Sequence, residues 1–299
     1  MKTLDEIRPK IKALEVMPTI PTIIHPLAAM MQMPADRVDL AKVIELVSYD
    51  STIAAQCLRM ANSPLFGRRN TDNIRSALVA LGLKRVQAIL LGCCLSRIVP
   101  PDKWALDAIS FWRHSLACAL VSSKMAHLIA YPDPEKAYLA GLLHDLGILV
   151  NSTVFTEDFR GCVEAAHNRH VPLHIVEQEF MGFTHCESGK ILAEQWHFSA
   201  DIVQVVELHH FEESLPVSQP LVSLVHITDL LCRLRDLGYG YYETMGIDLV
   251  GEAAWDTLVR HYPALANMDL ARLTLDIDGA MDEIVGIVDA VFAHPYQAA

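Results

Sequence analysis

Basic residues are scarce in this sequence. Its 299 residues include 24 Lys and Arg against 36 Asp and Glu, which gives a formal net charge of −12 at pH 7. No basic run is long enough to follow a chain of phosphates, so direct binding to nucleic acid or to an anionic membrane is not expected. A helix–glycine–helix joint around Gly82 has the spacing of a helix-turn-helix, but apolar residues stand where base-reading side chains would be needed.

Paired cysteines and long apolar runs are also missing. The seven cysteines contain no CxxC spacing, which favours reduced, buried thiols over a disulfide framework or a zinc knuckle. The longest apolar runs, such as 86–99, are interrupted by polar residues and are too short to span a bilayer. The N-terminal MKTLDEIRPKIKALEV has no apolar leader core, and we therefore expect a cytoplasmic protein.

Strand signals are nearly absent, whereas the 3.6-residue period recurs along the whole chain, which predicts an all-α protein. An apolar content of 52% supplies a large core. Pro100-Pro101 marks a boundary, and we expect an N-terminal helical subdomain (1–100), a helical bundle (101–236) and a C-terminal helical extension (237–299). Helices are predicted at 22–33, 39–48, 84–98, 104–130, 135–150, 157–169, 172–180, 184–196, 199–211, 219–236, 251–260 and 277–293, with two more ending at Ala61 and Leu81.

The stretch 137–150, AYLAGLLHDLGILV, carries His144 and Asp145 inside an otherwise apolar segment. As one continuous helix, this segment would direct both side chains into the core. An ionised carboxylate there is costly unless it is paired or bound to a cation.

Five more polar residues occupy apolar helix faces: His114, His185, His209, His210 and Asp229. A single such histidine is ordinarily a core residue with one hydrogen bond, and a metal-free core with seven hydrogen-bonded polar groups is one interpretation. Few Arg or Lys lie on these faces as partners, however. A divalent iron, manganese, zinc or nickel ion would account for all seven residues at once, because bundle helices commonly converge on such sites.

The order His114, His144-Asp145, Asp229 resembles the metal signature of the HD phosphohydrolase superfamily. Residues 14–235 resemble the HDOD family, the HD-related output domain of bacterial signalling proteins, through NSPLFG, LVALGLKRV, FWRHSLACAL, YLAGLLHDLGIL, THCESGKILAEQW and VVELHH. The resemblance implies an HD-like bundle with one or two metal ions. It assigns His114, His144, Asp145 and Asp229 to one ion and His185, His209 and His210 to the other, with Asp145 bridging.

The resemblance also implies an output or interaction module that binds a protein partner. The rival interpretation is a metal-dependent phosphohydrolase acting on a nucleotide or cyclic nucleotide. Many catalytic relatives have a lysine where Ile148 follows Gly147, and FEESLPV after His210 lacks a GYP motif. Gly238-Tyr239-Gly240 lies too far along the chain to replace it. Enzymatic activity is thus left open; a cationic pocket beside the metals would favour the enzyme, and a sealed apolar one the module.

Overall fold

The structure is a computed structural model that describes residues 3–13, 73–82, 103–210, 219–239, 251–266 and 278–286, together with isolated positions between 37 and 86. Every regular element in these ranges is a helix, so the predicted all-α class is confirmed. The helices predicted at 22–33, 39–48 and 84–98, the boundary at Pro100-Pro101 and the NSPLFG motif fall wholly or largely outside the described residues. The division into three parts stays a prediction.

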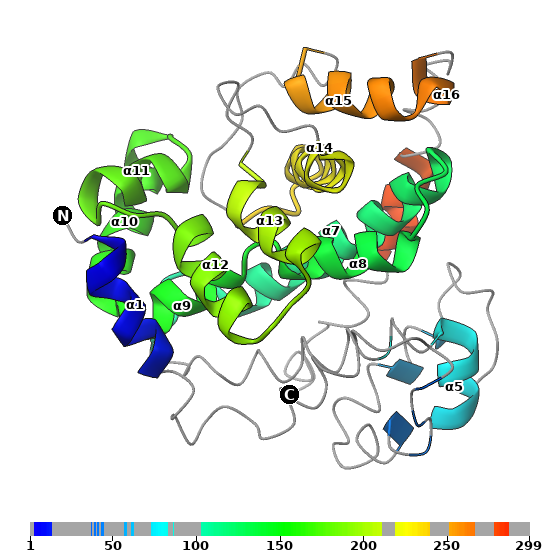
Figure 1. Cartoon of the computed structure of the whole chain (residues 1–299), viewed down its shortest axis with the longest axis horizontal. Coiled ribbons are helices and arrows are strands. Elements are labelled where there is room, and N and C mark those ends of the chain that lie inside the picture. Colours follow the sequence, from blue (N-terminus) through cyan, green and yellow to red (C-terminus); the bar gives the residue numbers. More distant parts are fainter. Residues whose placement is uncertain are drawn as a thin grey trace, which may run out of the picture.

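The central element is α7 (Ala108–Leu128), which runs through the middle of the bundle (Figure 1). It begins at Asp107, whose carboxylate accepts the backbone N–H of Ser110 at 2.7 Å. Most of the helix is buried, because α8 (Pro134–Leu143) and α14 (Pro220–Leu234) pack along it. The approach of α8 depends on Gly141, where a Cβ would lie 2.5 Å from the carbonyl oxygen of Cys118.

The single helix predicted over 135–150 is wrong, because the chain turns at His144 and Asp145. Helix α8 ends at Leu143, and α9 (Leu146–Val154) begins after Asp145, whose φ of −94° and ψ of 23° are not helical. Its carboxylate makes no capping bond to α9 and is turned toward other partners. A segment that is apolar on all sides gives no periodic signal for such a break.

The stretch Pro134–Val154 is apolar enough by length and composition to cross a membrane. In this protein it is a core segment, since 89% of its most apolar window is buried inside the bundle. The same composition therefore serves here to fill the interior.

Helix α9 packs directly on α12 (His185–Gln195), backbone against backbone. A Cβ on Gly147 would lie 1.7 Å from the carbonyl oxygen of His185, and a Cβ on Gly189 would lie 2.7 Å from the nitrogen of Gly147. A capping box between Thr184 and Glu187 starts α12. These contacts bring the first residue of α12 next to the turn between α8 and α9.

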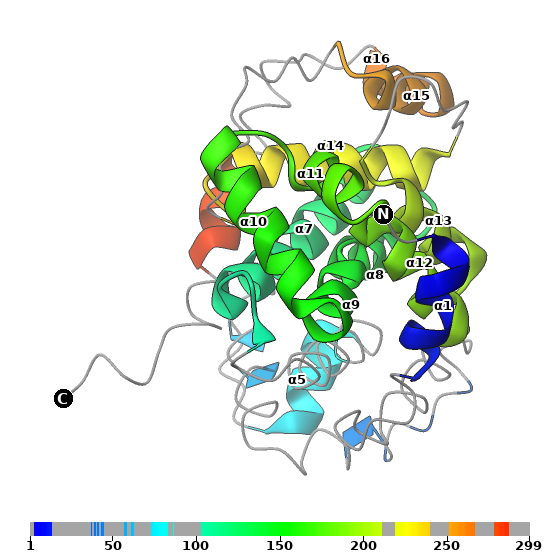
Figure 2. The same ribbon diagram turned by 90° about the vertical axis from the view of Figure 1, so that its left-hand side faces the viewer.

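The remaining helices surround this centre, and most of their bounds agree with the prediction to within a few residues. Figure 2 shows α14 between the bundle and the pair α15 and α16. The helix predicted at 199–211 ends earlier, at Leu208, which leaves His209 and His210 in the segment that follows it. The bounds are α1 (Leu4–Lys12), α5 (Ile74–Leu81), α10 (Thr156–Arg169), α11 (Leu173–Phe180), α13 (Ala200–Leu208), α15 (Ala253–His261) and α16 (Pro263–Ala266), with a further helical segment at 278–286.

Candidate metal centre

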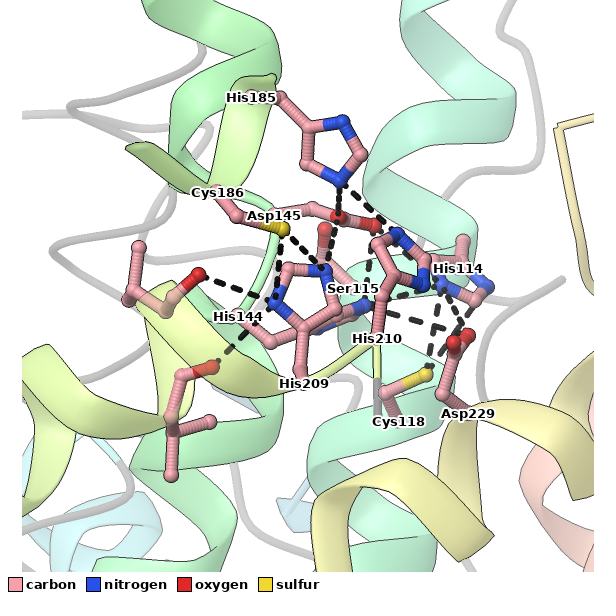
Figure 3. A network of polar contacts seen from close by, with 12 residues as sticks. His114, Ser115, Cys118, His144, Asp145, His185, Cys186, His209, His210 and Asp229 are labelled. Atoms are coloured by element: carbon pink, nitrogen blue, oxygen red, sulfur yellow. Dashed lines mark hydrogen bonds and ion pairs between the residues drawn. The ribbon is translucent and has the colours of Figure 1, made fainter. Parts of the chain in front are cut away.

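Asp145 lies at the centre of the polar cluster drawn in Figure 3. Its Oδ2 is 2.9 Å from Nε2 of His144 and 3.7 Å from Nε2 of His114. Its Oδ1 faces the other half of the cluster, 3.1 Å from Nε2 of His209 and 3.3 Å from Nε2 of His185. The two oxygens of one carboxylate thus address two groups of imidazoles, as a bridging ligand would.

Asp229, on α14, is the second buried carboxylate of the cluster. Its Oδ1 lies 3.1 Å from Nε2 of His114 and 4.0 Å from Nε2 of His144. Arg233, one helical turn later, also pairs with it: Nε donates to Oδ1 at 2.9 Å, and Nη2 lies 2.5 Å from Oδ2. The prediction that cationic partners are scarce is therefore wrong for Asp229, although the i, i+4 spacing was visible in the sequence.

The last predicted residue, His210, is also part of the cluster. Its Nε2 lies 3.0 Å from Nε2 of His185, and its ring stacks on His174 with the ring centroids 4.3 Å apart. The structure thus brings all seven predicted residues together from α7, the turn between α8 and α9, α12, the end of α13 and α14. Binding of an ion by these residues stays a prediction.

Four of the imidazoles are held from outside through Nδ1. The acceptors are Leu237 O for His114 at 2.6 Å, Gly141 O for His144 at 2.8 Å, Glu177 Oε2 for His185 at 2.6 Å and Val206 O for His209 at 3.1 Å. An acceptor at Nδ1 fixes the proton on that atom, so Nε2 presents a lone pair to the cluster in the neutral ring. Metal-binding histidines are oriented in this way by groups behind them.

In the neutral rings these inward lone pairs would face carboxylate oxygens, so acceptors would meet acceptors at about hydrogen-bond distance. Asp145 and His144 show this at 2.9 Å, and Asp229 and His114 at 3.1 Å. Such contacts are favourable only when a proton or a metal cation lies between the two atoms. Neutral imidazoles and carboxylates are suitable ligands for divalent transition metals. Three groups of histidines with an aspartate, a cysteine or both have ligand atoms within 4.8 Å of one another. The donor set therefore fits a metal.

The surroundings keep both carboxylates ionised. Burial raises the pKa of Asp145, but His144 and His185 outweigh burial and hold the pKa well below its ordinary value. Burial also raises the pKa of Asp229, but Arg233 and His114 together lower it by more, so the pKa lies well below its ordinary value. The cluster therefore contains two negative charges, and only Asp229 has an arginine among its partners in the described part of the chain.

The imidazoles divide into two kinds. Burial lowers the pKa of His144 and of His210, which favours the neutral form of the ring that binds metals. Burial also opposes protonation of His185, but the carboxylate of Glu177 leads the opposing effects and raises the pKa of this ring well above 6.5. In the metal-free protein a proton on His185 would therefore take the place of a cation.

Several residues of the site were missed in the sequence. Glu177 is fully buried on α11 and accepts both the ring and the backbone N–H of His185. Its place on an apolar helix face was a usable signal. The Tyr239 hydroxyl donates to Oδ2 of Asp145 and its ring packs on His114, so Tyr239 contributes to the site even though its loop lies too far along the chain to replace a GYP motif. His226 donates from Nδ1 to the carbonyl oxygen of His209 at 2.7 Å.

A pocket of about 330 Å³ lies on the outer side of Tyr239, between the start of α7 and α10. Its polar lining comes from Asp107, Glu164, His167 and Asn168, and none of its lining residues is Lys or Arg. Within the cluster itself, six of the seven predicted residues are at most 2% exposed. These six side chains are thus enclosed, whereas His210 is partly exposed, and this pocket offers no cation for a phosphate.

Comparison with known proteins identifies the fold and the family. Residues 17–211 match the family model of the HDOD domain. The chain belongs to the HDOD family. An HDOD domain protein of unknown function from Geobacter sulfurreducens has a similar structure, with a TM-score of 0.77 and 25% sequence identity, covering 97% of this chain and 99% of that chain. The resemblance inferred from the sequence is therefore confirmed.

Two further solved structures share the fold at lower identity, and one curated sequence is also similar. A candidate phosphohydrolase from Shewanella amazonensis SB2B has a TM-score of 0.68 and 19% identity over 94% of this chain and 97% of that chain. A candidate signal transduction protein from Marinobacter aquaeolei VT8 has a TM-score of 0.69 and 19% identity, covering 93% of this chain and 60% of that chain. An uncharacterized protein from Treponema pallidum is 26% identical over 67% of this chain, which spans 39% of that protein.

Proposed function

We propose that this HDOD protein is a bacterial cytoplasmic signalling output module whose HD-like bundle holds a divalent metal ion. The observation that carries the proposal is the orientation of four histidines, each anchored through Nδ1 with Nε2 turned toward Asp145 or Asp229. Among the described residues, the partners of Asp145 are imidazoles and a tyrosine hydroxyl, with no ammonium or guanidinium group. A divalent cation would compensate this charge.

The ion would act mainly on the structure of the module. Its ligands come from α7, the turn between α8 and α9, α12, the end of α13 and α14, so binding would hold these elements in one arrangement. Metal bound only by the folded state adds its binding free energy to folding, about 2.7 kcal/mol at a free concentration of 100 times Kd. The bundle could then present one fixed surface to a protein partner. The Marinobacter relative, named as a signal transduction protein, supports this role.

Hydrolysis of a phosphodiester is the second candidate function, and Arg233 is the observation that favours it. This guanidinium stands beside the cluster, where a substrate phosphate would need a positive charge, and one structural relative is a candidate phosphohydrolase. Two features weigh against it. Both carboxylate oxygens of Asp229 already engage Arg233, and Ile148 is fully buried at the position of the expected lysine.

Elemental analysis of the purified full-length protein tests the proposal. We expect about one to two equivalents of iron, manganese, zinc or nickel, lost in Asp145→Ala. The surface variant Asp201→Ala, which removes a half-exposed carboxylate paired with Lys136, should retain the metal. The absence of metal, both as purified and after reconstitution, would refute the metal site. Turnover of a cyclic dinucleotide or bis(p-nitrophenyl) phosphate that depends on Asp145 would instead establish the hydrolase.

A further inference from the structure

Two buried cysteines adjoin the histidine cluster, and one of them directly follows His185 at the start of α12. This residue, Cys186, lies with His185, His209 and His210 in a group whose ligand atoms are all within 4.8 Å of one another. Its Sγ is 3.9 Å from Nδ1 and 4.0 Å from Nε2 of His209. Figure 3 shows this sulfur pointing toward the imidazoles. The half of the cluster that faces Oδ1 of Asp145 therefore contains a thiol.

The neighbouring nitrogens in this half need a proton or a metal ion between them. Nε2 of His185 and Nε2 of His210 are 3.0 Å apart, and Nδ1 of His185 is occupied by Glu177. Two neutral imidazoles with lone pairs at this distance repel each other unless one carries a proton there or both bind an ion. The separation is compatible with two ligands of one metal, since zinc–nitrogen bonds are about 2.0 Å long.

Charge balance distinguishes this half from the other. Asp229 is paired with Arg233, so its charge is compensated by a side chain. Asp145 together with a thiolate at Cys186 would carry two negative charges, and one divalent ion neutralises both. The second cysteine of the cluster, Cys118, lies 3.5 Å from Nε2 of His114 on the side that Arg233 already compensates.

We propose that His185, Cys186, His209 and His210 form a zinc site in which Cys186 is a ligand, which rests on the metal-binding function proposed above. Three imidazoles and one thiolate are a borderline-soft donor set that selects zinc over magnesium, calcium or manganese. Four protein donors satisfy tetrahedral zinc without a bound water, as in structural sites, and Asp145, with Oδ1 3.1 Å from Nε2 of His209, would balance the charge beside this ligand set. The thiolate thus favours zinc over the harder ions, and the complete set of protein donors favours a structural role.

Cobalt(II) substitution in the full-length protein tests the ligand. Cobalt bound by a thiolate gives an intense near-ultraviolet charge-transfer band, and tetrahedral coordination gives strong visible bands. We expect both in the wild type, with loss of the charge-transfer band and about 100-fold or more weaker binding in Cys186→Ser, because even groups behind the ligands are worth about 10- to 100-fold. Cys118→Ser and Cys162→Ser, which remove other buried thiols, should keep the band.

The outcomes separate this inference from the function on which it rests. Cobalt bound without a charge-transfer band in the wild type, or a band lost in Cys118→Ser but kept in Cys186→Ser, would overturn the zinc–thiolate site while leaving the metal-binding module intact. Failure of the wild type to bind cobalt or zinc would overturn both. If Cys186→Ser does not fold, X-ray absorption at the zinc edge of the wild type decides: one sulfur neighbour supports the site, and none refutes it.

Discussion

Glu177 holds His185 in place from behind: its Oε2 accepts the Nδ1–H of the ring at 2.6 Å and the backbone N–H of the same residue at 2.9 Å. The other oxygen, Oε1, accepts the side-chain amide of Asn151 at 2.9 Å, so this fully buried carboxylate is satisfied on both sides. Groups behind a ligand set its orientation and its basicity. Glu177 is therefore a positioning residue of the centre.

Glu177→Gln should weaken metal binding by about 10- to 100-fold, because the amide keeps the shape but removes the negative charge behind His185. The measurement is a competition titration against a chelator of known affinity. Glu179→Gln on the same helix removes an exposed partner of Arg169 and serves as the control. Equal metal affinities in the two variants would show that Glu177 does not tune the ligand.

Arg233→Met should destabilise the metal-free protein by about 3–5 kcal/mol, because it leaves Asp229 buried and without its arginine. Added metal should recover part of this loss, since the ion supplies positive charge to the cluster. Urea unfolding with and without metal measures both quantities. Arg235→Met, which removes contacts to the exposed Asp278 and Asp282, should cost at most about 1 kcal/mol. If Arg233→Met also costs at most about 1 kcal/mol, the buried ion pair does not stabilise the protein as expected.

Gly147→Ala should destabilise the protein by about 1–3 kcal/mol or more, because the new methyl would stand 1.7 Å from a backbone oxygen that cannot turn aside. The matched control is Gly161→Ala in the middle of α10, where nothing lies within 4 Å of the added Cβ. That change should stabilise the protein by up to about 1 kcal/mol through helix propensity. Thermal unfolding of the two variants, with opposite signs expected, checks the packing of α9 on α12.

Metal affinity should rise with pH between about pH 6 and pH 8, because the ion competes with protons for the imidazoles. The pKa of His185 is raised well above 6.5 in the metal-free protein, so binding of an ion at Nε2 requires this ring to release a proton. Conversely, the stabilisation that this proton gives the metal-free protein is complete below about pH 6.5 and is lost as the pH rises through the raised pKa. Chelator competition at several pH values measures the slope, and an affinity independent of pH would contradict the assignment of His185 as a ligand.

The sequence predicted much of this arrangement, and the misses have physical reasons. The seven polar residues on apolar faces indeed meet, because a buried polar side chain needs a partner and the partners were the other members of the set. The turn at His144 and Asp145 was missed, since a segment apolar on all sides has no period that marks a break. Tyr239 reaches Asp145 across 94 positions of the chain, a contact that only tertiary packing determines. Arg233 and Glu177, by contrast, followed spacing rules that could have identified them.

The absence of a Cβ at both Gly147 and Gly189 limits how this protein can change shape. Sliding α9 along α12 by one residue would press the side chain of Ile148 or Lys190 against the facing backbone. The close backbone contact therefore restricts sliding of α9 along α12. We therefore expect a conformational change in this bundle to occur at other helix pairs, with Asp145 kept close to His185.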